Sequence, residues 1–109
     1  MADYKTLDQA NPAATTNTTL YTAPAPAIAS TLMVCNQGSS AATFRVAIRP
    51  AAAGLAAKHY VLYDEPLGAV GAGNSAIYTV GWSFAQTDVV TVYASTANVS
   101  FTLMGCENP

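Results

Sequence analysis

The segment ATFRVAIR (Ala42–Arg49) has the clearest two-residue period in this chain. Its apolar residues Phe44, Val46 and Ile48 alternate with residues that we expect to point outward, which is the pattern of a strand with one buried face. Pro50 follows and ends the run, because proline has no backbone N–H to donate to a neighbouring strand. The segment therefore predicts a β-strand that covers a core.

Short runs of β character occur along the rest of the chain at roughly ten-residue spacing, separated by turn residues. They are Thr18–Ala23, Ile28–Asn36, His59–Glu65, Ala76–Trp82, Val89–Ser95 and Val99–Cys106. In the last run we expect Val99, Phe101 and Leu103 to be buried, and regular alternation in the second run would place Ile28 and Leu32 on one face. About seven or eight strands without a long helix predict an all-β fold, a single antiparallel β-sandwich or a jelly-roll-like barrel.

Residues 1–17 differ from the rest of the chain, because they are polar, contain Pro12 and show no periodicity. They predict an extended, loosely attached N-terminal arm, followed by a β-sandwich domain at residues 18–109. We expect the sandwich to stay folded when such an arm is removed. The opening MADYKTLDQANP also lacks the basic residues and the apolar stretch of a secretion signal, which predicts synthesis in the cytoplasm.

The chain is poor in charge, since 9% of its 109 residues are Asp, Glu, Lys or Arg, against about 25% in an average globular domain. The formal net charge of −2 gives no attraction to nucleic acid or to anionic membranes, and no apolar run approaches the roughly 18 residues of a membrane helix. Exposed positions must then be filled largely by small and neutral polar side chains, which adhere to a partner at little desolvation cost. This composition is typical of one part of a larger assembly.

The two cysteines, Cys35 and Cys106, are far apart in the chain. Without export, we expect both to be reduced thiols that pack as small side chains, and the alternative is a disulfide between an early strand and the last one. One histidine and two isolated cysteines do not form a metal-ligand cluster, so we expect neither a metal nor a cofactor.

No group of residues in the sequence has the pattern of a catalytic site, so we do not expect an enzyme. His59 has no Gly-x-Ser-x-Gly motif to accompany it and is expected to be a surface residue at the start of a strand. Asp64 and Glu65 are adjacent and should face opposite sides of a strand, unlike the converging carboxylates of a glycosidase. The glycines of Leu67–Ser75 are not followed by the Lys-Ser/Thr pair of a phosphate-binding loop.

Arg45 and Arg49 are the candidate partner-contact residues, because they project from one face of a single strand, roughly 13 Å apart by strand rise. Either guanidinium can bind the carboxylates of a partner, although two solubilising charges on a solvated face explain the pair equally well. The aromatic residues offer another kind of site, since exposed rings stack on sugars, whereas aromatics at strand spacing usually belong to a core. They are Tyr60, Tyr63, Tyr78, Trp82 and Tyr93.

The order of segments resembles that of small virion structural proteins of tailed bacteriophages. The resemblance covers most of the chain after residue 18, and its most distinctive part is VCNQG (34–38), a Phe-Arg-x-x-Ile-Arg strand (44–49) and Lys-His-Tyr (58–60). It implies a β-sandwich subunit present in many copies on the particle. Such a subunit decorates, or cements, the capsid, or belongs to the tail, neck or baseplate. A carbohydrate-binding module of a host-recognition fibre is the alternative from another class.

For a cement protein, the implied partner is the major capsid protein lattice of the same phage, or the tail proteins if the subunit belongs there. The resemblance also implies a homo-oligomer, a trimer or a dimer, located in the virion without a nucleic-acid or membrane partner. The arm expected at residues 1–17 suits this role, because a flexible segment can fold onto a neighbouring protein as it binds.

Overall fold

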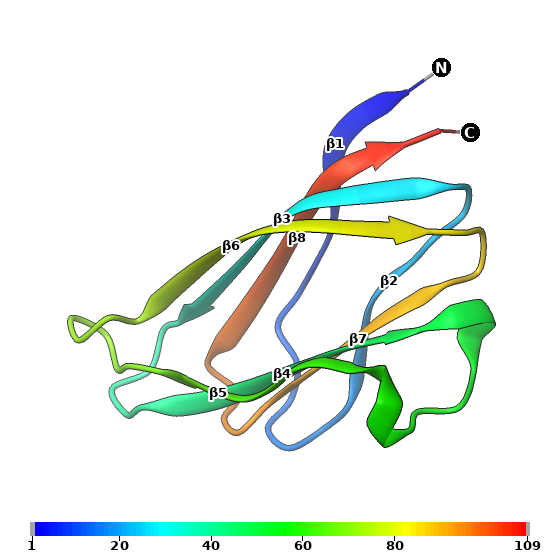
Figure 1. The fold of residues 1–109 in the computed structure, drawn as a ribbon. Helices are drawn as coiled ribbons and strands as arrows, with labels where there is room; N and C mark the ends of the chain where they lie inside the picture. The colour runs from blue at the N-terminus through cyan, green and yellow to red at the C-terminus, as the bar shows by residue number, and fades with distance from the viewer. Residues whose placement is uncertain (1, 109) are drawn as a thin grey trace.

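The protein forms eight β-strands in two four-stranded sheets (Figure 1). The structure is a computed structural model and describes residues 2–108. The strands are β1 (Asp3–Ala10), β2 (Thr18–Thr22), β3 (Ala27–Asn36), β4 (Ala42–Arg49), β5 (Tyr60–Leu67), β6 (Ser75–Phe84), β7 (Val89–Ala94) and β8 (Val99–Glu107). Two short 3₁₀ turns, η1 (Pro50–Ala52) and η2 (Ala57–His59), lie between β4 and β5. Among residues 2–108, no helix has the length and hydrophobicity needed to span a lipid bilayer.

The two sheets pack face to face as a sandwich, and all paired strands are antiparallel. Sheet A has the strand order β1-β8-β3-β6, and sheet B has the order β2-β7-β4-β5. The first and last strands are neighbours in sheet A, where Asp3 near the start of β1 pairs with Glu107 at the end of β8 (Figure 1). This architecture confirms the all-β antiparallel sandwich expected from the spacing of the runs.

The core lies between the sheets and contains the apolar faces predicted from the alternation. The six residues expected there are Phe44, Val46, Ile48, Val99, Phe101 and Leu103. Five of them have no exposed surface, and Ile48, near the end of β4, is half-buried. The rings of Phe44 and Phe101 meet edge to face with their centroids 5.9 Å apart, which links the two sheets at the centre of the core.

The regular alternation expected for β3 is wrong, because a β-bulge interrupts the strand at Ser30. The register shifts between Ala29 and Thr31 against both β6 and β8. The extra residue changes which side chains face the core, so that Ala29 and Leu32 are fully buried while Ile28 is 56% exposed. Ile28 and Leu32 therefore lie on opposite faces of the sheet.

The prediction of a loosely attached N-terminal arm is also wrong for residues 3–10. These residues form strand β1, which pairs with β8. The register runs from Asp3 opposite Glu107 to Ala10 opposite Phe101. Leu7 is the buried residue of this strand, and most of the others are exposed. Because so few of its side chains face the core, the strand lacks the apolar alternation by which the other strands were recognised. The sandwich thus begins at β1 rather than at residue 18.

Candidate functional site

A β-bulge in β5 assembles the candidate site on the outer face of sheet B. Opposite the single residue Arg45 of β4, the bulge places both Tyr63 and Asp64. Asp64 has a φ of +50°, in the left-handed region that Asp tolerates better than most residues other than glycine. The bulge therefore presents an aromatic ring and a carboxylate to the same guanidinium.

Arg45 lies between two tyrosine rings and a carboxylate. Its Nε donates a hydrogen bond to Asp64 Oδ1 at 2.6 Å, and the two side chains form an ion pair through the same atoms. Its Cζ lies 4.2 Å from the ring centroid of Tyr63 and 4.4 Å from that of Tyr93 on β7. The hydrogen bond to Asp64 raises the pKa of Arg45 above its usual value, so the group stays charged. Cation–π attraction and the ion pair together fix a positive charge at the surface.

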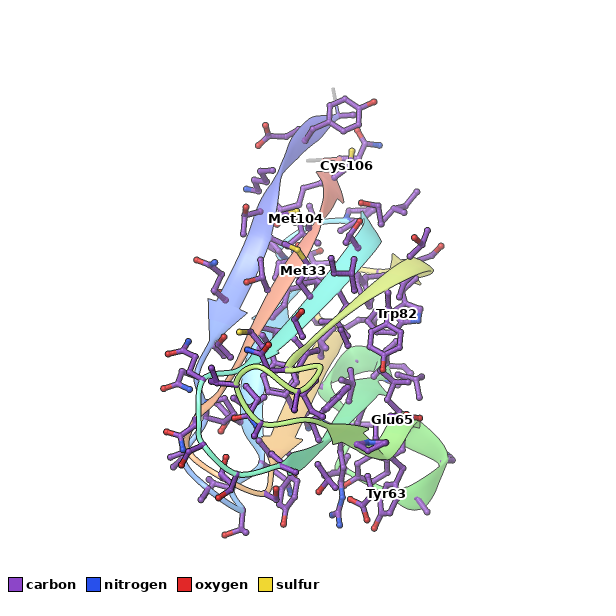
Figure 2. The ribbon with its side chains drawn as sticks, turned by 90° about the vertical axis from the view of Figure 1, so that its left-hand side faces the viewer. Met33, Tyr63, Glu65, Trp82, Met104 and Cys106 are labelled. Carbon is purple, nitrogen blue, oxygen red and sulfur yellow. The ribbon has the colours of Figure 1, made fainter. Side chains whose placement is uncertain are left out.

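Tyr60 extends this site toward the connection between β4 and β5. The rings of Tyr60 and Tyr63 meet edge to face, with centroids 4.9 Å apart and planes at 87°. Beside them lies a depression of about 560 Å³, which is also lined by Leu55, Ala56 and Ala57. Tyr63 is 56% exposed and lies on the surface of β5 (Figure 2). We call Arg45, Tyr60, Tyr63, Asp64 and Tyr93 the Arg45 cluster.

Arg49, the second predicted contact residue, makes structural hydrogen bonds on the same face. Its Nε donates to Thr91 Oγ1 at 3.0 Å, and its Nη1 donates to the carbonyl of Ala53 at 2.7 Å. These bonds hold the chain that follows β4 against β7. The two arginines therefore differ in role. Arg45 belongs to the Arg45 cluster, whereas Arg49 holds the chain after β4 in place through its hydrogen bonds.

His59 is not the surface residue expected from the sequence, because only 7% of it is exposed. It ends η2, and its Nδ1 accepts a hydrogen bond from the backbone N–H of Ala56 at 3.0 Å. The ring thus stabilises the turn that forms one wall of the depression beside the Arg45 cluster. The sequence alone does not indicate this role of His59, because the role depends on how the connection between β4 and β5 folds over sheet B.

The neighbouring carboxylates Asp64 and Glu65 face opposite sides of sheet B, as predicted. Asp64 binds Arg45 on the outer face, whereas Glu65 is half-buried on the inner side. Burial raises the pKa of Tyr78, and the negative charge of Glu65 raises it further. The two carboxylates therefore do not converge on a common site.

The glycines between β5 and β6 have a conformational explanation. A Cβ atom at Gly68 would lie 1.9 Å from the carbonyl oxygen of Ala72. Gly71 and Gly73 have φ values of +83° and +75°, which side chains other than glycine rarely adopt. These residues build a tight turn between two edge strands.

The aromatic residues considered as a possible sugar platform divide between surface and core. Tyr78 and Trp82 of β6 face the interior and are half-buried, and the ring of Tyr78 lies 6.3 Å from that of Phe44. The other three belong to the outer face of sheet B and are Tyr60, Tyr63 and Tyr93. Of these five rings only that of Tyr63 is largely exposed, and the rings of Tyr60 and Tyr93 are half-buried beside it.

The outer face of sheet A is different in character, because no charged side chain projects from β3, β6 or β8 on this side. We call it the uncharged face, and it consists of Ile28, Ser30, Thr31, Met33, Cys35, Ile77, Thr79, Gly81, Ser83, Ser100, Thr102, Met104 and Cys106. Met33, Met104 and Cys106 follow one another along β3 and β8 (Figure 2). Cys35 and Cys106 are free cysteines that are half-buried on this face, and they lie apart, because Cys35 pairs with Ser100 and Cys106 with Ile28.

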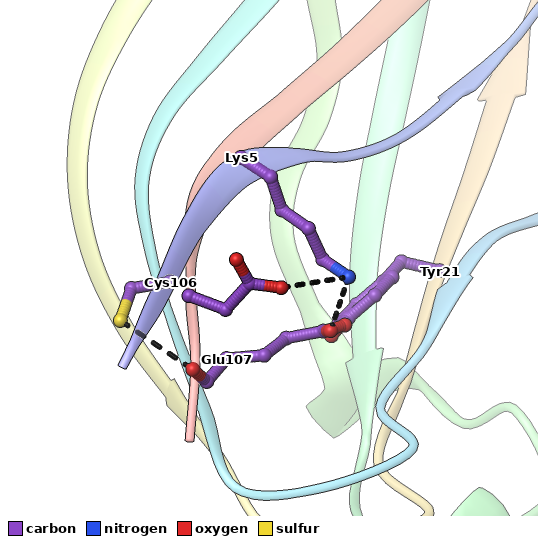
Figure 3. A network of polar contacts seen from close by, with 5 residues as sticks. Lys5, Tyr21, Cys106 and Glu107 are labelled. Carbon is purple, nitrogen blue, oxygen red and sulfur yellow. Dashed lines mark hydrogen bonds and ion pairs between the residues drawn. The ribbon is translucent and has the colours of Figure 1, made fainter. Parts of the chain in front are cut away.

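A buried polar network near the termini was not predicted. Glu107 of β8 is 6% exposed, and its Oε1 accepts a hydrogen bond from Lys5 Nζ of β1 at 2.6 Å (Figure 3). Its Oε2 accepts one from the hydroxyl of Tyr21 of β2 at 2.5 Å. The hydrogen bond from Lys5 lowers the pKa of Glu107 below its usual value, and the one from Tyr21 acts in the same direction. The network joins both sheets.

Asn36 forms a second unexpected polar centre, at the end of β3. It is fully buried, and its Nδ2 donates to the carbonyls of Ser40 and Gly68 at 2.9 and 3.0 Å. Its Oδ1 accepts from the N–H of Gly38 at 2.9 Å. The strand run predicted at Ile28–Asn36 ends at this residue, but nothing in the sequence indicates that its amide would hold two loops together.

Within residues 2–108, no three His, Cys, Asp or Glu side chains lie together as a metal site requires. No family model and no curated protein matches the chain. The Arg45 cluster and the uncharged face are the two distinctive surface features of the described residues.

Proposed function

We propose that this protein is a non-enzymatic virion structural protein of a tailed bacteriophage, and specifically a capsid decoration, or cement, protein. The observation that carries the proposal is the uncharged face of sheet A, on a chain with few charges overall. The centres of protein interfaces are depleted of charged residues, whereas the free surface of a monomer is usually rich in them. The resemblance of the sequence to small virion proteins supplies the kind of assembly.

The Arg45 cluster supplies a defined anchor for the partner in this proposal. Tyr and Arg are the residues that most often dominate binding free energy at interfaces, especially where a ring or guanidinium is held in place before binding. Arg45 is held by Asp64 and two rings, while Tyr63 remains more than half exposed. We infer that an acidic segment of the capsid protein contacts this cluster.

The proposal is tested by adding the purified protein to undecorated capsids of its phage. A protein that binds only the assembled lattice stabilises that lattice, so we expect greater resistance to heat and to osmotic shock. Binding to the lattice should also be much tighter than binding to unassembled capsid protein. Capsids that gain no stability, or a virion map that places the protein in the tail, neck or baseplate, would exclude the cement function.

The anchor is tested with Arg45→Glu, and Lys58→Glu is the matched control because it makes the same charge change at an exposed position outside the cluster. Co-sedimentation with capsids should fall at least about tenfold for Arg45→Glu, the loss of one central charged contact, and little for Lys58→Glu. Equal losses in both variants would show that net charge, and not the cluster, governs binding.

A second candidate function is carbohydrate binding, which is favoured by the exposed ring of Tyr63 next to a depression and an Arg–Asp pair. Sugars bind by stacking on an aromatic ring while polar groups hold their hydroxyls. Glycan-array binding that is abolished by Tyr63→Ala and retained in Val70→Ala would support this function. The protein would then be the carbohydrate-binding module of a host-recognition fibre.

A further inference from the structure

Each sheet of the sandwich has two edge strands, and an edge exposes backbone N–H and C=O groups that can pair with another strand. The edges of sheet A are β1 and β6, and those of sheet B are β2 and β5. Proteins usually protect such edges with charged residues, proline, bulges or short strands. The four edges of this protein differ sharply in this respect.

Three of the edges are protected. β1 carries Asp3, Lys5 and Asp8 and contains a bulge. β5 carries Asp64 and Pro66 and also contains bulges. β2 is only five residues long and contacts β1 across the sandwich. None of these strands offers a long, regular and uncharged edge.

The fourth edge, β6, has no charge and no proline to protect it, although a bulge interrupts its pairing with β3 near its C-terminal end. Its sequence SAIYTVGWSF spans ten residues and contains neither a charged residue nor a proline. From Ser75 to Thr79 it pairs regularly with β3, and the register shifts only beyond Thr79. In this regular segment Ile77 is 70% exposed on the uncharged face, beside Met33 of β3. An edge of this kind is a site for the addition of a strand.

We propose that a second copy of this chain binds here, with β6 pairing antiparallel to β6 of the partner about a two-fold axis at Ile77. The two copies of sheet A would then form one continuous sheet. In such an interface residues meet their symmetry mates, so a charged strand would place like charges close together. The absence of charge along β6, and along the part of the uncharged face that adjoins it, removes this repulsion.

The side chains of the regular segment fit this register. Ile77 would lie beside Ile77 of the other copy on the outer face, and Ser75 would lie beside Thr79. On the inner side, Tyr78 would lie beside Ala76, so a large residue meets a small one. Tyr78 and Ala76 are both half-buried in the single chain, and pairing would complete their burial. A Ser–Thr pair across two strands stabilises a sheet through the hydrogen bond between its hydroxyl groups.

The interface is tested by measuring mass in solution by sedimentation for the wild-type protein, Ile77→Lys and Ile77→Glu. We expect the wild type to have twice the 11.2 kDa mass of the chain, and each variant alone to have the single mass. Val61→Lys is the matched control, because Val61 is also an exposed strand residue, on β5, and should leave the dimer intact. Circular dichroism must show that the variants keep their strand content.

Mixing Ile77→Lys with Ile77→Glu tests the position of the axis. If the two positions face each other, the opposite charges attract and the mixture regains the double mass. A monomeric wild type at its highest soluble concentration, a dimer that survives Ile77→Lys, or a mixture that stays monomeric would each overturn the proposal. These measurements need only the purified protein. The dimer proposal can therefore be overturned while the proposed cement function stands, and the cement function can be overturned while the dimer stands.

Discussion

The hydroxyl of Tyr21 donates to the carboxylate of Glu107 at 2.5 Å, although the two residues are 86 positions apart. Tyr21 belongs to sheet B and Glu107 to sheet A, so this bond joins the sheets near the chain termini (Figure 3). Lys5 adds an ion pair from β1 to the other oxygen of the same carboxylate. Three strands thus depend on a single buried acidic group.

Glu107→Gln should therefore destabilise the protein at neutral pH. The amide keeps the shape of the side chain but loses the charge that both partners stabilise, and hydrogen bonds to a charged group contribute more than neutral ones. We expect the free energy of unfolding in urea to fall by about 1–2 kcal/mol. Asp8→Asn, which neutralises an exposed carboxylate on β1, is the control and should have little effect.

The stabilisation by Glu107 should disappear in acid. Because the pKa of Glu107 is lower in the folded protein than its ordinary value of 4.5, the unfolded chain binds more protons in this range, and stability rises with pH. The contribution is fully present above pH 4.5 and is lost as the pH falls through the lower folded value. Urea unfolding as a function of pH should show the wild type and Glu107→Gln converging below pH 4.5, and parallel curves would contradict this.

Phe101→Ala should cost about 3–5 kcal/mol, because it leaves a cavity where β8 meets Phe44 at the centre of the core. This is a large part of the stability of a small domain. Thermal melting followed by circular dichroism measures the loss. Val61→Ala removes an exposed apolar side chain from β5 and should change the melting temperature little. A similar small effect of Phe101→Ala would show that the inner face of β8 is not the core.

The fold could be predicted from the sequence because most strands alternate apolar and polar residues. Phe44, Val46 and Phe101 are buried as this period requires. The two-residue period predicts the wrong buried side chains where a strand contains one extra residue, as at Ser30 of β3. A bulge of this kind has no regular signature in a single sequence. The period also failed for β1, whose Leu7 is the main side chain that reaches the core.

The candidate site could be predicted only in part. Arg45 was correctly placed on an outer strand face, but its contacts with Tyr63 and Asp64 depend on the bulge in β5. The contact of Glu107 with Tyr21 depends on how the sheets pack, so no spacing in the sequence indicates it. Long-range polar contacts of this kind become visible only when the register of every strand is known.

Substitution of Asp64 separates the ion pair from the backbone conformation. Asp64→Gly and Asp64→Val both remove the carboxylate, but only glycine accepts a φ of +50° without strain. We expect Asp64→Val to unfold at lower urea concentration than Asp64→Gly, by about 1–2 kcal/mol in the free energy of unfolding. Equal stabilities would show that the bulge relaxes to a different backbone geometry when the aspartate is replaced.

Deletion of residues 1–10 should destabilise the sandwich, contrary to what the polar composition of this segment suggests. The deletion removes the strand that pairs with β8, takes Leu7 from the core and leaves Glu107 without Lys5. The loss of the Leu7 contacts alone should cost about 2 kcal/mol or more, which corresponds to roughly 10 °C in melting temperature for a domain of this size.

Leu7→Ala is the matched variant for this deletion, because it keeps β1 and the ion pair while removing the buried side chain. We expect it to lose part of the stability that the deletion loses, and the remainder measures the pairing with β8 and the contact of Lys5 with Glu107. If the truncated protein instead melts at the wild-type temperature, β1 contributes nothing to the stability of the sandwich. Residues 1–10 would then behave as the detachable arm that their composition predicts.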